Sequence, residues 1–166
     1  MFNWSDLLDY TRKLAYGRNQ NREDLSLVLK ESKGTCSSKH ALLKKLADLN
    51  GLENVKLILG MYKMNHLNTP KIESTLTNVG LDYLPEAHCY LKINNKRFDL
   101  TSGNANIENL AGGLLEELEI EPEQVNTFKA DFHKTYLKKW IDENAITMGF
   151  DQVWELREMC IKKLEG

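Results

Sequence analysis

The chain is poor in cysteine and in basic or long apolar segments, and each shortage excludes a class of protein. Three cysteines are an odd number and a poor disulfide framework, so we expect a reduced, cytoplasmic protein. No apolar run reaches the roughly 20 residues that span a bilayer, and no signal peptide is visible, so no membrane partner is expected. The formal net charge is −2 and no long basic block occurs, so nucleic acid is not an expected partner either.

The residue pairs that usually bind metals are also missing. The sequence has four histidines, but no C-x-x-C and no H-x-x-x-H pair. A phosphate-binding glycine loop is absent as well. We therefore expect neither a metal site nor a cofactor.

The remaining pattern predicts one α+β domain over residues 1–166. Hydrophobic residues make up 42% and charged residues 28%, as in ordinary globular proteins. Apolar spacing and glycine breaks predict helices over 5–17 (capped by Ser5 or Asn3), 36–50 and 107–118, from Pro122 onward and from Asp151 onward, and strands over 55–64, 88–93 and 96–101. Gly60 marks a possible bulge. The expected fold packs a helix on an antiparallel sheet, with a core over about 30–102 and a helical part over about 105–166.

Residues 88–101 are predicted to form a β-hairpin with Asn94-Asn95 as its two-residue turn, because Asn tolerates positive φ. This register sorts the side chains onto two faces. The apolar face carries Cys89, Leu91, Ile93, Phe98 and Leu100. The polar face carries His88, Tyr90, Lys92, Arg97, Asp99 and Thr101. His88 and Asp99 become diagonal neighbours, roughly 7–8 Å apart at the backbone, a gap that two side chains can bridge.

Cys36 stands at the point where a loop containing Gly34 is expected to turn into a helix. Unpaired N–H groups at a helix start favour the thiolate, which is the nucleophilic form of cysteine. His88 can take the thiol proton and return it to a leaving group. Asp99 can fix the tautomer of the imidazole and stabilise the imidazolium. The three residues together predict a cysteine nucleophile with its base and its orienting carboxylate.

Stabilisation of an oxyanion needs further donors. The backbone N–H of Cys36 is a natural first donor, because it belongs to the helix start. The polar loop that contains Asn19, Gln20 and Asn21 is the candidate for a second donor. The sequence alone does not place this loop.

The substrate site also needs walls. Tyr90 shares the polar face of the hairpin with His88 and is a candidate for one wall. The loops over 18–22 and 66–84 are expected to supply others, because a long loop before a candidate catalytic strand is often functional.

Each of the three residues also has a plainer interpretation. Cys36 can be a small buried apolar residue, His88 a half-buried strand histidine and Asp99 a surface charge. Their joint placement favours the catalytic interpretation. His40 lies one helical turn beyond Cys36 and is a rival base. A positive charge is unfavourable in the first turns of a helix, so we expect a packing or hydrogen-bonding role for His40.

Three stretches of the chain resemble the transglutaminase-like superfamily: Gly34–Leu43, Ala87–Leu91 and Phe98–Thr101. A G-x-C motif precedes an apolar helix, a His opens a strand, and an aromatic residue precedes D-x-T. The match spans about residues 30–102. The resemblance implies a helix led by a nucleophilic Cys and packed on an antiparallel sheet that supplies His and Asp, as in papain-like enzymes.

The resemblance assigns Cys36 as the nucleophile, His88 as the base and Asp99 as the orienter. The chain departs from the family at two places. Many members have an aromatic residue directly after the Cys or the His, whereas Ser37 and Cys89 stand there in this sequence. The family contains cross-linkers, peptidases, amidases and inactive members, so the resemblance specifies the triad better than the substrate.

The expected function is that of a thiol-dependent hydrolase or acyltransferase. It would act on a peptide, amide or other acyl-bearing substrate through an acyl-enzyme intermediate. Two alternatives stay open: acyl transfer like that of an arylamine N-acetyltransferase, and a catalytically inactive binding or scaffolding domain. No acidic D-x-D-x-D loop indicates calcium. The sequence leaves the oligomeric state open.

Overall fold

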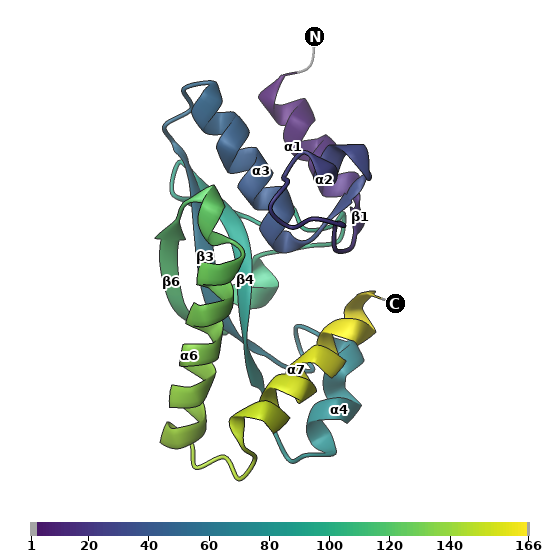
Figure 1. Cartoon of the computed structure of the whole chain (residues 1–166), viewed down its shortest axis with the longest axis vertical. Helices are drawn as coiled ribbons and strands as arrows, with labels where there is room; N and C mark the ends of the chain where they lie inside the picture. The colour runs from purple at the N-terminus through teal and green to yellow at the C-terminus, as the bar shows by residue number, and fades with distance from the viewer. Residues whose placement is uncertain (1–2, 166) are drawn as a thin grey trace.

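The computed structural model describes residues 3–165, and it has helices packed on a central antiparallel sheet (Figure 1). The sheet has four strands in the order β5-β4-β3-β6. These strands are β3 (Val55–Met64), β4 (Leu84–Ile93), β5 (Lys96–Phe98) and β6 (Leu114–Ile120). A separate parallel pair joins β1 (Ala15–Tyr16) and β2 (Lys33–Gly34). The predicted α+β class is confirmed.

Helices cover both faces of this sheet. They are α1 (Trp4–Lys13), α2 (Leu27–Lys30), α3 (Cys36–Leu49), α4 (Glu73–Thr77), α5 (Glu108–Ala111), α6 (Thr127–Glu143) and α7 (Phe150–Glu165), with single 3₁₀ turns over Pro70–Ile72 and Pro122–Gln124. None of the helices within residues 3–165 is long and apolar enough to cross a membrane.

The two faces of the central strand β3 belong to two hydrophobic clusters. Leu57, Leu59 and Met61 pack in a cluster with the apolar face of α3. Ile58 and Tyr62 pack in a second cluster with residues of α6 and α7. β3 is therefore buried on both sides, which explains its nearly continuous apolar sequence.

The start of α3 is fixed by its N-terminal cap. The Thr35 hydroxyl accepts a hydrogen bond from the Ser38 N–H at 3.3 Å, and the Thr35 N–H donates to Ser38 Oγ at 2.9 Å. This reciprocal pair makes Cys36 the first residue of the helix. Gly51, at φ +69°, follows the other end of α3 in the left-handed conformation that suits glycine.

The hairpin has the predicted turn and register. Asn94 and Asn95 have φ values of 51° and 65°. Leu91 pairs with Phe98, as the two-residue turn requires. The return strand is shorter than predicted, however, and ends at Phe98 instead of Thr101. The chain leaves the sheet after Phe98, because the residues that follow are hydrogen bonded to α3, as described below.

The helix predicted over 107–118 is wrong for most of its length. Only Glu108–Ala111 is helical, and Leu114–Ile120 forms strand β6 along the free edge of β3. Gly112-Gly113 interrupts the helix, and the open edge of β3 supplies backbone partners that the sequence pattern does not show.

Gly60 is not the site of the bulge either. The irregularity in the pairing of β3 with β6 lies between Met61 and Tyr62. Gly60 instead makes room for the ring of Tyr90, since a Cβ at this position would lie 2.8 Å from atoms of that ring.

Candidate active site

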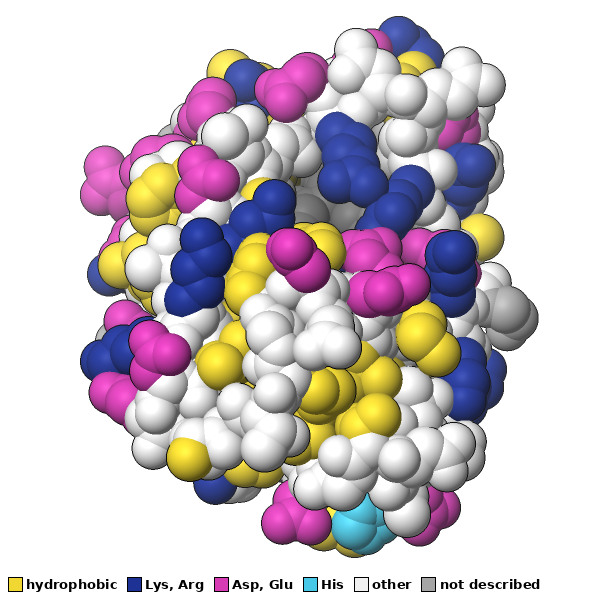
Figure 2. Space-filling view, turned by 60° about the horizontal axis from the view of Figure 1, so that its bottom comes forward, with side chains coloured by type: hydrophobic (Ala, Val, Ile, Leu, Met, Phe, Trp, Pro, Cys, Tyr) yellow, Lys and Arg dark blue, Asp and Glu magenta, His cyan; other side chains and the backbone are white. Residues whose placement is uncertain are grey.

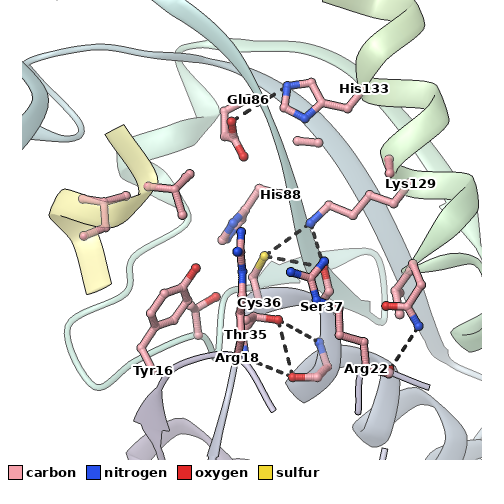
Figure 3. Close-up of a pocket in the computed structure, with 18 of the residues that line it drawn as sticks. Tyr16, Arg18, Arg22, Thr35, Cys36, Ser37, Glu86, His88, Lys129 and His133 are labelled. Atoms are coloured by element: carbon pink, nitrogen blue, oxygen red, sulfur yellow. Dashed lines mark hydrogen bonds and ion pairs between the residues drawn. The ribbon is translucent and has the colours of Figure 1, made fainter. Parts of the chain in front are cut away.

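A pocket of about 490 Å³ lies at the N-terminal end of α3. Segments far apart in the sequence line it: the loop after β1, the start of α3, the middle of β4, and helices α6 and α7. Figure 3 shows side chains from these segments around the sulfur of Cys36. On the face drawn in Figure 2, Lys and Arg side chains gather round a hollow, with Asp and Glu side chains along one edge.

Cys36 lines this pocket and is 8% exposed. The cap on α3 leaves the backbone N–H groups of Cys36 and Ser37 without a backbone acceptor among residues 3–165. These two groups and the helix dipole stabilise negative charge on the sulfur, or on an oxygen bound beside it.

His88 on β4 links Cys36 to Asp99, which lies just beyond β5. His88 Nε2 and Asp99 Oδ2 are 2.8 Å apart. The other carboxylate oxygen, Oδ1, accepts hydrogen bonds from the N–H and the hydroxyl of Thr101 at 3.0 and 2.5 Å. Because Nε2 faces Asp99, Nδ1 is the ring nitrogen of His88 left for exchange of a proton with Cys36. The structure thus brings the three predicted residues together: Cys36 and His88 line one pocket, and His88 is hydrogen bonded to Asp99.

The first turns of α3 also hold the segment that follows β5. His40 Nε2 accepts a hydrogen bond from the Leu100 N–H at 2.8 Å, and its Nδ1 lies 2.7 Å from the Cys36 carbonyl oxygen, to which it donates. Burial lowers the pKa of His40 to about 4, so this ring is neutral. Lys39 Nζ donates to the carbonyl oxygen of Thr101 at 2.8 Å. His40 therefore has the expected hydrogen-bonding role, which connects the two halves of the site.

The protonation states of Cys36, His88 and Asp99 follow from the charged groups around them. Burial raises the pKa of the Cys36 thiol, but the positive charges of Lys129 and His88 outweigh burial and lower it to about 5. Burial lowers the pKa of His88, but Asp99 and the Cys36 thiolate raise it well above its usual value. Burial likewise acts against the Asp99 carboxylate, yet His88 keeps the pKa of Asp99 well below its usual range. At neutral pH the site holds a thiolate, an imidazolium and a carboxylate.

Lys129 is a second cation at the sulfur that the sequence did not reveal. It projects from α6 into the pocket, and its Nζ lies 3.6 Å from Cys36 Sγ and 2.7 Å from Ser37 Oγ (Figure 3). Burial disfavours its charge, but the Cys36 thiolate raises the pKa of Lys129 overall. Ser37, the residue directly after Cys36, is a hydrogen-bond partner of this ammonium group.

Asn19 lines the pocket, but its amide is already engaged. It donates to the Leu27 carbonyl oxygen at 3.3 Å, to Glu31 Oε2 at 2.9 Å and to the Lys33 carbonyl oxygen at 3.0 Å. These bonds fix the polar loop against α2 and β2. Asn19 therefore positions the loop, and its amide is not available as the expected oxyanion donor.

The other two polar residues of this loop do not reach the pocket. Gln20 and Asn21 are exposed and are not among its lining residues, which corrects the expectation that they supply an oxyanion donor. Asn21 Oδ1 accepts a hydrogen bond from the Glu23 N–H and so serves a local turn. Two arginines of the same loop, Arg18 and Arg22, line the pocket instead.

Two further expectations about the walls need correction. Tyr90 is fully buried and does not line the pocket, because its ring fills the space above Gly60 and its hydroxyl donates to Glu117. The segment over 66–84 contributes no lining residue either. The opposite wall comes from the C-terminal helices α6 and α7, whose role the sequence left open.

A buried ion pair lies on the side of the pocket formed by β4 and α7. Arg157 donates to both carboxylate oxygens of Glu86, at 2.7 and 2.9 Å. Burial raises the pKa of Glu86, but Arg157 lowers it below its usual value, so the pair is ionised. Trp154 covers the Arg157 guanidinium, which lies 5.2 Å from the ring centroid. This pair attaches α7 to the sheet beside the pocket.

Within residues 3–165 no cluster of three or more His, Cys, Asp and Glu side chains is arranged to hold a metal ion. The pocket offers Lys and Arg side chains, which suit an anion better than a cation. Comparisons with protein-family models, curated proteins and solved structures give no significant match. The chemistry of the site is therefore the basis for assigning a function.

Proposed function

We propose that this protein is a thiol enzyme that acts on an amide or related acyl group through an acyl-enzyme on Cys36. The observation that carries the proposal is that Cys36 and His88 line the same pocket and that His88 is hydrogen bonded to Asp99. The other cysteines provide a contrast. Burial raises the pKa of Cys89 and of Cys160, as expected of inert thiols, whereas the pKa of Cys36 is lowered to about 5.

The proposal extends to a transglutaminase-like core. Three features support it: α3 begins at Cys36, α3 packs against the antiparallel pair β3 and β4, and His88 lies on β4. Asp99 follows the next strand, at hydrogen-bonding distance from His88. The cytoplasmic location is part of the same proposal, because all three cysteines are free thiols and a reducing compartment keeps them so.

In the first half of the reaction the Cys36 thiolate attacks the carbonyl carbon of the substrate. The carbonyl oxygen becomes an oxyanion, which the backbone N–H groups of Cys36 and Ser37 and the ammonium group of Lys129 stabilise. His88 donates its Nδ1 proton to the leaving amine or alcohol as the bond to the carbonyl carbon breaks. The acyl group remains on sulfur as a thioester, and His88 is left neutral.

In the second half His88 acts as a base. It takes a proton from water or from an acceptor amine, and the resulting nucleophile attacks the thioester carbon. The carbon–sulfur bond breaks, the acyl product leaves, and the thiolate–imidazolium pair is restored. Asp99 holds the Nε2–H of His88 throughout, so that Nδ1 stays directed at the sulfur.

The proposal is tested by measuring the alkylation of Cys36 by iodoacetamide as a function of pH. In the wild-type protein the rate should rise with a midpoint near pH 5, because the thiolate forms there. His88→Ala should move the midpoint upward, and Cys36→Ser should remove the reaction, since Cys89 and Cys160 are fully buried. A profile like that of a free thiol, near pH 8.5, in both the wild type and His88→Ala would contradict the proposal.

Activity is measured separately with 4-nitrophenyl acetate, with and without an added arylamine. Release of nitrophenol followed by hydrolysis of the acetyl-enzyme indicates a hydrolase, and acetylation of the arylamine indicates transfer. A reactive Cys36 that forms no acyl-enzyme with any ester or amide tested would instead favour a binding domain on this fold.

A further inference from the structure

The loop after β1 directs two arginines into the pocket. The Gly17 N–H donates to the Gly34 carbonyl oxygen at 3.2 Å, and Asn19 ties the loop to α2 and β2. Arg18 and Arg22 lie on either side of Asn19, and both line the pocket. In Figure 3 their side chains extend from the loop beside Cys36. The loop is therefore held by its own hydrogen bonds, and its arginines are left for the pocket.

The pocket carries an excess of positive charge. Four Lys and Arg side chains line it, from Arg18, Arg22, Lys129 and Arg157, against the carboxylates of Glu86 and Glu158, while the charges of the His88 imidazolium and the Cys36 thiolate cancel. The whole chain, in contrast, has a formal net charge of −2. A concave site with one sign of charge concentrates ions of the opposite sign.

These cations differ in how far they are neutralised. Arg157 is neutralised by its two bonds to Glu86. Arg18 has only long contacts, at 3.7 Å, to Glu158 and Glu165. Charge-assisted hydrogen bonds are usually about 2.7–2.9 Å long, so these contacts are weak.

Arg22 is the least neutralised of the four. Its guanidinium has no ion-pair partner in the described part of the chain, and only its backbone carbonyl oxygen accepts a hydrogen bond, from Asn126 at 3.0 Å. A planar guanidinium presents parallel donors that match the oxygens of a carboxylate or a phosphate. Arg22 thus has the donors of an anion site, and no acceptor among residues 3–165 engages them.

We propose that Arg18 and Arg22 bind an anionic oxygen group, a carboxylate or a phosphate, on the substrate that acylates Cys36. This inference rests on the proposed function of Cys36 and adds the class of substrate: an acyl donor with a negative charge near its reacting carbonyl. The anion lies against the arginine loop, while the carbonyl lies beside the thiolate with its oxygen toward Lys129. The long contacts of Arg18 to α7 are exchanged for bonds to the substrate.

The test compares two alkylating reagents that differ in charge, iodoacetate and iodoacetamide. The rate of Cys36 with iodoacetate is divided by its rate with iodoacetamide. This quotient is then divided by the same quotient for free N-acetylcysteine, which gives the normalised ratio. The proposal predicts a normalised ratio about tenfold above one in the wild type. Arg18→Gln and Arg22→Gln should each lower it. Arg97→Gln removes the same charge from the outer hairpin, where Arg97 contacts Glu117 at 2.6 Å, and should leave the ratio unchanged.

A second arm identifies the anion. Succinate and inorganic phosphate are tested, at constant ionic strength, for protection of Cys36 against iodoacetamide, and their binding is measured by isothermal titration calorimetry. Protection by succinate alone indicates a carboxylate, and protection by phosphate alone indicates a phosphate.

The outcomes separate the two proposals. A Cys36 inert to both reagents overturns the proposed function, while calorimetry still reports anion binding and its dependence on Arg22. A reactive Cys36 with the same normalised ratio in the wild type and both arginine variants, and no binding of either anion, overturns the substrate class alone.

Discussion

The Nζ atom of Lys129 lies 3.6 Å from the Sγ atom of Cys36, so the candidate nucleophile has a second cation beside it in addition to His88. The same ammonium group donates to Ser37 Oγ at 2.7 Å, which fixes it at the start of α3. The thiolate is therefore stabilised from two sides, by β4 through His88 and by α6 through Lys129.

Replacing Lys129 by Met should raise the pKa of Cys36, because the variant keeps the length of the side chain and removes its charge. Loss of one nearby opposite charge typically shifts a pKa by about 1–2 units. The midpoint of iodoacetamide alkylation should move upward by this amount, and acylation by 4-nitrophenyl acetate should slow. Lys139→Met is the matched control, since Lys139 lies on the same helix and its side chain is 72% exposed. Equal midpoints in the two variants would show that Lys129 does not act on the sulfur.

Replacing Asp99 by Asn should narrow the pH range of activity. The Asp99 charge raises the pKa of His88, so its removal lowers that pKa. Transfer of a proton to the leaving group requires the imidazolium, and activity is lost as pH rises through the pKa of His88. The basic limb of the pH profile for 4-nitrophenyl acetate hydrolysis should therefore move to lower pH. An unchanged basic limb in Asp99→Asn would argue against Asp99 as the orienter.

His40 should make the protein less stable as the pH falls from about 6.5 to about 4. Its pKa is near 6.5 in the unfolded chain and about 4 in the folded protein, so the unfolded state binds more protons in this window. The free energy of unfolding should fall by roughly 3 kcal/mol across it from this group. His40→Gln keeps a donor and an acceptor but does not titrate. Its free energy of unfolding, measured by urea denaturation at each pH, should therefore depend less on pH. The same pH dependence in the variant and the wild type would mean that His40 is not held neutral.

Gly60→Ala should destabilise the fold without changing any charge. The added Cβ would lie 2.8 Å from the Tyr90 ring, which is fully buried and cannot move aside easily. Overpacking of this kind typically costs about 1–3 kcal/mol in the free energy of unfolding. Gly112→Ala is the control, because a Cβ there meets no atom within 4 Å. Urea denaturation that gave both variants wild-type stability would show that the sheet accommodates the methyl group.

Much of the candidate site could be predicted because local rules determine it. The Asn94-Asn95 turn sets the register of the hairpin, so that Asp99, the residue directly after β5, comes close to His88 on β4. The cap formed by Thr35 fixes the start of α3, so Cys36 could be placed at a helix N-terminus from its neighbours alone. Strand β6 could not be predicted, because its leucines at helical spacing pair with the open edge of β3, which forms only in the folded chain.

Residue type and local periodicity identify which residues could be a nucleophile, a base and an orienter. The groups that surround them depend on how distant segments pack together. Lys129 lies 93 residues from Cys36 and looks like any helix-surface lysine until α6 packs beside the sheet. Arg18 and Arg22, and not the amides between them, line the pocket because hydrogen bonds to distant residues orient their loop. Contacts of this kind depend on packing between segments that have no fixed spacing in the chain, so no local pattern specifies them.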